Sequence, residues 1–437
     1  MRIKSTNTVF LIVVTLALCF SAHAQQTNAA RVAEIQTALQ DAKLDGWLFY
    51  DFRGSDPLSY RILKLGPSGI TTRRWFYYIP AKGEPVKLVH SIERGKLDQL
   101  PGRRIVYLPW QGLQASLREV LTGRSETRKV GSRVGGGRRI AMQYSPDNAI
   151  PYMSRVDAGT IELIRSFGVE PVTSADLVQR FEAVWSDEQR MMHDQVADTI
   201  HRIIMESFAE VARRIRADVP TTEYDIQQFM ERRFASEGMT NDDDPPIIAV
   251  NGNAANPHYQ PTREINSPIK RGDFVLFDVW YKLKKPDAVY ADESWTGYVG
   301  ESVPEEYTRI FNIVRDARDA AVSFIQSSLK SGKSITGAAV DDIARGVITR
   351  AGYGPQFLHR TGHSIGEEVH GNGANIDNLE TKDSRSIIPH TCFSIEPGIY
   401  LEGKFGVRSE INVYIVNDRE AIVTGKPIQI EVIAILK

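Results

Sequence analysis

Residues 272–280 read GDFVLFDVW, an apolar run interrupted by the carboxylate of Asp278. The run is typical of a buried strand, where an aspartate is seldom placed unless something compensates its charge. A second aspartate, Asp292, lies on the next predicted strand, residues 289–298. A hairpin would put these carboxylates side by side, where repulsion would keep one of them protonated unless a cation lies between them.

Two glutamates repeat this pattern further along the chain. Glu396 ends the apolar run 392–396 (CFSIE) just before a Pro-Gly turn, and Glu410 lies within 406–413 (GVRSEINV), between apolar residues. Four buried carboxylates with nothing to neutralise them would be strongly destabilising. One or two bound divalent cations therefore explain the pattern most simply.

Histidines supply the remaining candidate ligands. Three of the nine histidines lie within residues 359–370 (HRTGHSIGEEVH), and the glycines of this segment favour an extended conformation over a helix. A single buried aspartate or histidine is more often a hydrogen-bonded core residue than a ligand. Five such residues in one half of the chain indicate a metal site rich in oxygen ligands with one nitrogen.

The rest of the chain predicts two domains. Helix and strand alternate from residue 30 to about 180, which favours a small α/β domain. From Ser186 a long amphipathic helix begins and Pro220 stops it, and a second helix covers 222–236. Strands are predicted at 247–251, 274–283 and 289–298, then a helix capped by Ser302 and Glu305, a helix over 335–350, and strands at 392–395, 407–416 and 429–436. This repeated order of helix, helix and strands suggests two similar halves around a shared cleft.

Composition narrows the class of protein. The chain has 437 residues, 42% hydrophobic and 24% charged, with a formal net charge of -1, so it lacks the positive field of nucleic-acid-binding proteins. Arg2 and Lys4, the apolar run 9–20 and the small residues around Ala24 predict a signal peptide over residues 1–24. We expect a secreted or periplasmic protein, with no second segment long enough to span a membrane. Its one remaining cysteine, Cys392, cannot form an internal disulfide.

Five ordered motifs over residues 186–437 resemble the pita-bread metallopeptidase family M24, which contains creatinase, aminopeptidase P, prolidase and methionine aminopeptidase. The motifs are 272–278 (GDFVLFD), 290–292 (YAD), 359–370, 395–400 (IEPGIY) and 407–410 (VRSE). The resemblance implies an α+β fold. Residues 186–437 would form a pita-bread catalytic domain with pseudo-twofold α-α-β halves, and residues 30–185 a smaller α/β creatinase-like N-terminal domain.

The resemblance also implies roles for individual residues. Five of them would bind two metal ions, Glu396 would also take part in catalysis by accepting or relaying a proton, and five others would bind or polarise the substrate. The metal ligands would be Asp278, Asp292, His363, Glu396 and Glu410, and the substrate-binding residues His258, His359, His370, Tyr400 and Arg408, of which the three histidines would also be catalytic. Because the ligands are mostly carboxylates, manganese is favoured, although cobalt, iron or zinc could occupy the site.

The spacing of His359, His363 and His370 resembles the Xaa-Pro branch of the family. That branch hydrolyses peptide bonds preceding proline with a hydroxide that bridges two divalent metals. The expected substrate is a peptide or dipeptide with proline at the second position, and the resemblance allows a homodimer. The sequence leaves open whether the enzyme is an aminopeptidase or a dipeptidase (prolidase).

Several departures from relatives leave the shape of the substrate pocket open. Trp280 stands where relatives often have glycine, Trp295 where they have arginine, and Gly371 where an acidic residue is common. Trp280, Tyr281 and Trp295 either shape the pocket or simply pack in the core. Two rival functions also remain: a metal-free amidinohydrolase like creatinase, and an inactive peptide-binding member of the same fold.

Overall fold

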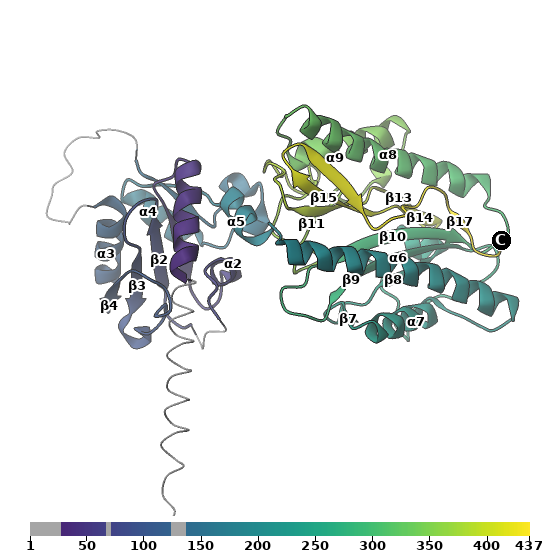
Figure 1. The fold of residues 1–437 in the computed structure, drawn as a ribbon, viewed down its shortest axis with the longest axis horizontal. Coiled ribbons are helices and arrows are strands. Elements are labelled where there is room, and N and C mark those ends of the chain that lie inside the picture. The colour runs from purple at the N-terminus through teal and green to yellow at the C-terminus, as the bar shows by residue number, and fades with distance from the viewer. Residues whose placement is uncertain (1–27, 67–70, 124–136) are drawn as a thin grey trace, which may run out of the picture. The chain divides into compact units, whose positions relative to one another are not determined.

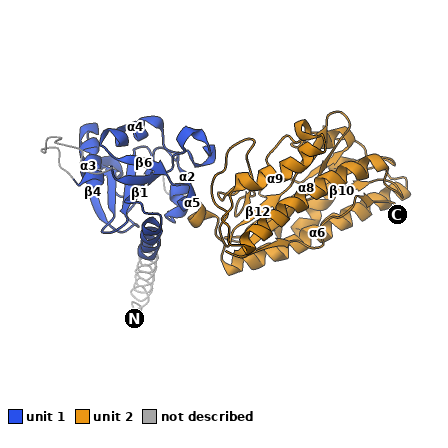
Figure 2. Ribbon diagram, turned by 90° about the horizontal axis from the view of Figure 1, so that it is seen from above, with its two compact units in different colours: residues 1–178 blue, residues 179–437 orange. Residues whose placement is uncertain are grey.

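The computed structural model describes residues 28–66, 71–123 and 137–437. The predicted signal peptide, residues 1–24, lies outside this described part. The chain divides into two compact units, residues 1–178 and 179–437 (Figure 2). In the described ranges none of the helices combines the length and the apolar composition that crossing a membrane requires.

The first unit is built on a six-stranded mixed sheet in the order β4-β3-β2-β1-β5-β6, of which Figure 1 labels β2, β3 and β4. A helix that includes residues 28–41 leads into the central strand β1, which pairs antiparallel with β2 and parallel with β5. Leu48 of β1 and Phe76 of β2 pack with Leu117 of α3 in the core. The elements are β1 (Gly46–Asp51), α2 (Pro57–Ile62), β2 (Trp75–Pro80), β3 (Val86–His90), β4 (Arg103–Tyr107), α3 (Trp110–Thr122), β5 (Arg139–Met142), α4 (Ala158–Ser166), β6 (Glu170–Thr173) and α5 (Ala175–Glu182), which crosses into the second unit, with short 3-10 turns at Ser91–Glu93, Pro146–Asn148 and Pro151–Met153.

The second unit repeats one order of elements twice, two helices followed by strands. In the first half, a capping box between Ser186 and Gln189 starts the long helix α6, and Thr222 caps α7 in the same way. Strand β9 pairs with β10, β8 and β7, and β17 from the chain's end pairs with β10. The elements are α6 (Asp187–Arg216), α7 (Glu223–Ser236), β7 (Met239–Thr240), β8 (Ile247–Val250), the 3-10 turn Asn251–Ala255, β9 (Phe274–Leu283) and β10 (Ala291–Tyr298).

The second half places two helices before a four-stranded sheet, β11-β12-β15-β16, and a two-stranded sheet, β13-β14. Phe311 and Val314 of α8 pack with Phe393 of β12 and Val413 of β15, so that α8 buries its apolar face on these strands. The elements are α8 (Glu305–Lys330), α9 (Gly337–Arg350), the 3-10 turn Gly354–Gln356, β11 (Ser364–Ile365), β12 (Cys392–Ile395), β13 (Gly398–Leu401), β14 (Phe405–Arg408), β15 (Ile411–Asn417), β16 (Glu420–Thr424) and β17 (Ile433–Ala434). The predicted pseudo-twofold α-α-β order is confirmed.

Side chains alternate between the two faces of the β9–β10 hairpin, and this decides on which face the aspartates lie. Phe277 and Val279 of β9 pack with Phe208 of α6, in one apolar cluster with Ala291 and Trp295 of β10. Because successive side chains of a strand point to opposite faces, Asp278 and Asp292 lie on the face away from α6. The helix thus covers one side of the hairpin and leaves its carboxylates to the other side.

Three local predictions were wrong. Helix α8 begins at Glu305, directly after Pro304, whose fixed backbone defines this start. Ser302 and Glu305 therefore form no capping box. The strand predicted over 407–416 is interrupted at residues 409 and 410, and only residues 433–434 of the predicted strand 429–436 pair with a neighbour. At the first interruption the backbone N–H of Glu410 bonds to the carbonyl of Ser294, and in the second region the side chain of Gln429 bonds to the backbone of Thr296 in place of strand pairing.

Candidate metal centre

The β9–β10 hairpin brings its two aspartates onto one face. Asp278 lies opposite Ser294, and Asp292 lies opposite Trp280. The carboxylates are therefore diagonal neighbours across the two strands: Asp292 is two residues along β10 from Ser294, the direct partner of Asp278. The hydroxyl of Ser294 lies beside them on the same face. The predicted hairpin is confirmed, but its two aspartates lie diagonally across it and not directly opposite each other.

The second half of the unit adds the two glutamates from neighbouring strand ends. Glu396 follows β12, and Glu410 lies between β14 and β15. Strands β12 and β15 pair antiparallel, with Ile395 opposite Ile411, so the residues just outside this pair are held close together. The backbone N–H of Glu410 also donates to the carbonyl of Ser294, at 3.4 Å, which joins the two sheets.

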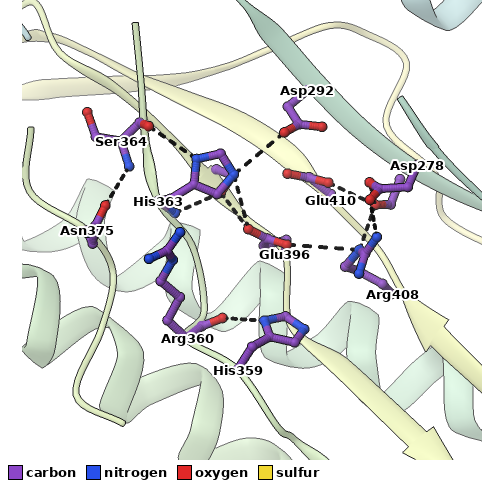
Figure 3. A network of polar contacts seen from close by, with 12 residues as sticks. Asp278, Asp292, His359, Arg360, His363, Ser364, Asn375, Glu396, Arg408 and Glu410 are labelled. Carbon is purple, nitrogen blue, oxygen red and sulfur yellow. Dashed lines mark hydrogen bonds and ion pairs between the residues drawn. The ribbon is translucent and has the colours of Figure 1, made fainter. Parts of the chain in front are cut away.

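Figure 3 shows the side chains of these four acids converging with His363 and Arg408. The Nε2 atom of His363 is 3.6 Å from Asp292 Oδ2 and 3.4 Å from Glu396 Oε1. The hydroxyl of Ser294 lies 2.6 Å from Asp278 Oδ1 and 2.8 Å from Glu410 Oε2. Since a hydroxyl has one hydrogen, it can satisfy only one of these two carboxylates at a time.

Unpaired oxygens within this cluster test whether a metal ion fits. Asp292, His363 and Glu410 each offer one ligand atom, and these atoms lie within 4.8 Å of one another. Asp292 Oδ1 and Glu410 Oε1 are buried and have no hydrogen-bond partner among the residues that the structure describes. Buried carboxylate oxygens without donors suit a hard divalent cation, and the single imidazole suits the transition metals among them. The residues present therefore fit the predicted metal.

Burial and mutual repulsion govern the charge of these acids. Burial raises the pKa of Asp292 and of Glu410 well above the ordinary range of carboxyl groups, and the neighbouring carboxylates raise both further. Burial likewise raises the pKa of Glu396 to about 7, against the opposing effect of Arg408. Burial lowers the pKa of His363, so its imidazole is held neutral, as a metal ligand must be. The protein thus disfavours three negative charges here unless positive charge is added.

Arg408 supplies part of that positive charge. Its guanidinium forms an ion pair with Asp278, donates to the hydroxyl of Ser294 at 2.9 Å, and lies 3.9 Å from Glu396 Oε2. It also donates to the hydroxyl of Tyr400 at 3.1 Å, and the Nε2 atom of His359 lies 2.7 Å from that hydroxyl. Both carboxylate oxygens of Asp278 are thus engaged by protein groups, which distinguishes it from Asp292 and Glu410.

The structure places the other predicted substrate residues around the cluster. The ring of His370 lies edge-on to that of His363, with 4.3 Å between centroids. Burial lowers the pKa of His359 to about 3, so it is neutral at neutral pH. His258 is exposed, and its backbone N–H donates to Asn256 Oδ1 at 3.1 Å. His258 lies on a loop outside the buried set, yet near enough to His370 to lower its pKa further, after burial and Arg360.

Two of the three aromatic residues considered for the pocket pack in the core instead. Trp295 and Tyr281 belong to the cluster under α6 and α7, where Trp295 meets His201 and Tyr281 stacks on Phe234. Trp280 alone lies on the face of Asp278, beside Tyr290. Sequence reasoning missed Ser294, although its place two residues after Asp292 on a strand puts it on the same face.

The fold and the cluster together define the pita-bread class of α+β proteins with a carboxylate-rich metal site. The sequence pattern of metallopeptidase family M24 matches residues 196–417, about half of the chain. The chain belongs to the metallopeptidase family M24.

Named relatives and solved structures agree with this class. The chain is 36% identical over 175 residues to a Xaa-Pro dipeptidase of Lactobacillus helveticus, and this alignment covers 40% of this chain and 43% of that protein. It thus spans less than half the length of that curated relative. Its fold is similar to dipeptidase PepE from Mycobacterium ulcerans, with a TM-score of 0.64, 22% identity, and coverage of 94% and 98% of the two chains. It is also similar to an X-prolyl aminopeptidase from Caenorhabditis elegans described as having a di-nuclear active site, with a TM-score of 0.60, 16% identity, and coverage of 92% and 63%.

Proposed function

We propose that this protein is a dinuclear metallopeptidase that hydrolyses the peptide bond preceding proline, as a Xaa-Pro aminopeptidase or dipeptidase. One observation carries the proposal: the carboxylates of Asp292 and Glu410 converge on His363, each with a buried oxygen that lacks a hydrogen-bond partner among the described residues. Membership of family M24 and the name of the Lactobacillus relative support it.

In this reaction the residues of the site would have separate roles. Asp278, Asp292, His363, Glu396 and Glu410 would hold two divalent cations. Such a pair supplies a nucleophile from water at neutral pH and polarises the scissile carbonyl. Glu396 would also accept or relay the proton that hydrolysis releases. His370 and His258 would donate hydrogen bonds to the substrate. The two ring nitrogens of His359 already lie 2.7 Å from the carbonyl of Arg360 and 2.7 Å from the hydroxyl of Tyr400, so His359 would act through Tyr400, which with Arg408 would fix the carboxylates behind the substrate.

Manganese is the metal we propose, because carboxylates make up most of the ligand set.

The proposed specificity for a proline after the cleaved bond follows from the chemistry of that bond. A bond ahead of proline has no N–H, and the ring fixes the backbone, so a dedicated pocket is required to bind it. Trp280, on the face of Asp278, is the aromatic residue placed to line such a pocket.

A peptide panel tests this proposal. Purified enzyme loaded with manganese, cobalt, iron or zinc should cleave Xaa-Pro and Xaa-Pro-Yaa peptides and leave Met-Ala-Yaa and Xaa-Ala peptides largely intact, with liberated amino acids measured by chromatography. Cleavage of Xaa-Pro but not Xaa-Pro-Yaa would assign a dipeptidase. Full activity after complete chelation would favour the metal-free amidinohydrolase class instead, and metal binding without any cleavage would favour a peptide-binding role.

We also propose that the protein is exported, on the sequence of residues 1–24. Expression in a bacterial host should then yield a mature chain that begins at Gln25, as measured by intact mass and N-terminal sequencing of the periplasmic or secreted fraction. A variant with Leu11→Arg and Val14→Arg, which breaks the apolar run, should leave the precursor uncleaved in the cytoplasm. Recovery of full-length wild-type chain from the cytoplasm alone would contradict export.

A further inference from the structure

The segment that carries the histidines has almost no regular structure of its own. Residues 357–363 lie between the 3-10 turn that ends at Gln356 and the two-residue strand β11, and an isolated bridge at Gly362 is their only strand-like pairing within the described residues. Yet His359 and His363 must keep fixed positions to meet Tyr400 and the carboxylates. Something outside the segment must therefore hold it.

Asp341, on helix α9, is fully buried and contacts this segment directly. Its Oδ1 accepts from the backbone N–H of Thr361 at 3.0 Å and from the Thr361 hydroxyl at 2.5 Å. Its Oδ2 accepts from the backbone N–H of Asn378 at 3.0 Å. Thr361 is buried between His359 and His363, and its carbonyl accepts from the backbone N–H of Glu396 at 2.7 Å. One carboxylate thus reaches the backbone of the histidine segment and, through it, that of Glu396.

Arg345 lies one helical turn further along α9 and completes the arrangement. It donates to both oxygens of Asp341, at 3.0 and 2.9 Å, in a bidentate ion pair. Its remaining donors reach the carbonyls of Phe357, at 3.2 Å, and His359, at 2.8 Å. The guanidinium fork therefore joins the helix to the segment at two further points.

We propose that Asp341 and Arg345 are positioning residues that fix residues 357–363, and through them His359 and His363, against the metal ligands. We call this attachment of residues 357–363 to helix α9 the tether. Its effect on metal binding and catalysis rests on the function proposed above, whereas the tether itself does not. Both residues act through the backbone and through Thr361, with no contact to the reacting atoms.

Hydrogen-bond chemistry explains why a carboxylate is needed. Every group that contacts Asp341 is a donor: two backbone N–H groups, one hydroxyl and two guanidinium N–H groups. Asparagine would turn an NH2 group toward donors on one side, which leaves buried donors unsatisfied and breaks the ion pair with Arg345. The change keeps size and shape, so it tests the charge and the acceptors rather than packing.

The first test uses Asp341→Asn with a neighbouring control. Asp342→Asn changes an exposed aspartate on the same helix that accepts a side-chain bond from Asn378. In metal-free protein, hydrogen exchange read by mass spectrometry should accelerate about tenfold or more in peptides covering 357–363 for Asp341→Asn and stay unchanged for Asp342→Asn. Exchange in peptides of helix α6 should match the wild type in both variants, which separates a local tether from global destabilisation.

The second test follows the metal alone. Cobalt titrated into metal-free protein, followed by visible absorption, should bind about 10–100-fold more weakly to Asp341→Asn, with an altered spectrum, because the imidazole of His363 is no longer held in place. Asp342→Asn should reproduce the wild-type titration. If the wild type itself binds no cobalt, the proposed function fails, and the exchange experiment still decides the tether.

Milder changes guard against a variant that fails to fold. Thr361→Val removes one donor while keeping the shape of the side chain, and should reproduce part of the exchange effect. Arg345→Lys keeps the charge but cannot span Asp341 and two carbonyls. In the double variant Asp341→Asn/Thr361→Val the effects should be less than additive. Wild-type exchange of residues 357–363 in Asp341→Asn, or wild-type cobalt affinity and spectrum despite faster exchange, would overturn the proposal.

Discussion

Replacing Glu396 with glutamine should lower kcat for an Xaa-Pro substrate by roughly 10²–10⁴-fold, the usual contribution of a group that transfers a proton. The carboxylate of Glu396 lies 3.4 Å from the Nε2 atom of His363, and the hydroxyl of Ser394 donates to it at 3.0 Å. Glutamine keeps the shape and can keep the bond from Ser394, but it can neither accept the proton nor supply a negatively charged ligand. Steady-state kinetics with saturating manganese measures the loss.

The control for this variant is Glu402→Gln. Glu402 is an exposed glutamate just beyond β13, in the same half of the unit, so its change should leave kcat and KM as in the wild type. Circular dichroism and the thermal midpoint establish that both variants fold. If Glu396→Gln retained kcat within about threefold of the wild type, the role given to this carboxylate in the proposed mechanism would be lost.

The fold was predictable because its signals are local. Strands β2, β9 and β12 coincide with the predicted ranges, since apolar runs between turns leave little choice of boundary. Helix α6 begins directly after Ser186, as its amphipathic pattern predicts. The interruption at Ser409 and Glu410 could not be predicted in this way. The hydrogen bond from Arg318 of helix α8 to Ser409, at 2.7 Å, depends on tertiary structure that no local pattern contains.

The candidate site was predictable in its residue types but not in its pairing. Carboxylates within apolar runs drew attention to Asp278, Asp292, Glu396 and Glu410, and the structure brings them together. That Arg408 pairs with Asp278, and that Asp292 and Glu410 have oxygens without donors, depends on the meeting of two sheets. Asp341 gave no signal at all, because an aspartate within a helix looks like a solvated residue until its burial is known.

Replacing Asp292 with asparagine should leave the metal-free protein as stable as the wild type or more stable, but should make the metal-bound protein less stable than the metal-bound wild type. In metal-free protein the variant should be as stable as the wild type or more stable, because a neutral amide replaces one of several crowded, buried carboxylates. With metal, the wild type gains stability from binding, about 2.7 kcal/mol when free metal exceeds Kd a hundredfold, and the variant should lose most of this gain. Urea unfolding with and without manganese measures both states.

The matched control is Asp287→Asn, an exposed position in the loop that joins β9 to β10. Its backbone has a positive φ of 56°, which asparagine tolerates, so its metal-dependent gain should equal that of the wild type. A simple packing role for Asp292 would make Asp292→Asn less stable in both states by the same amount. Equal losses with and without manganese would therefore argue against a metal ligand at this position, since only a ligand couples the stability of the hairpin to the concentration of the cation.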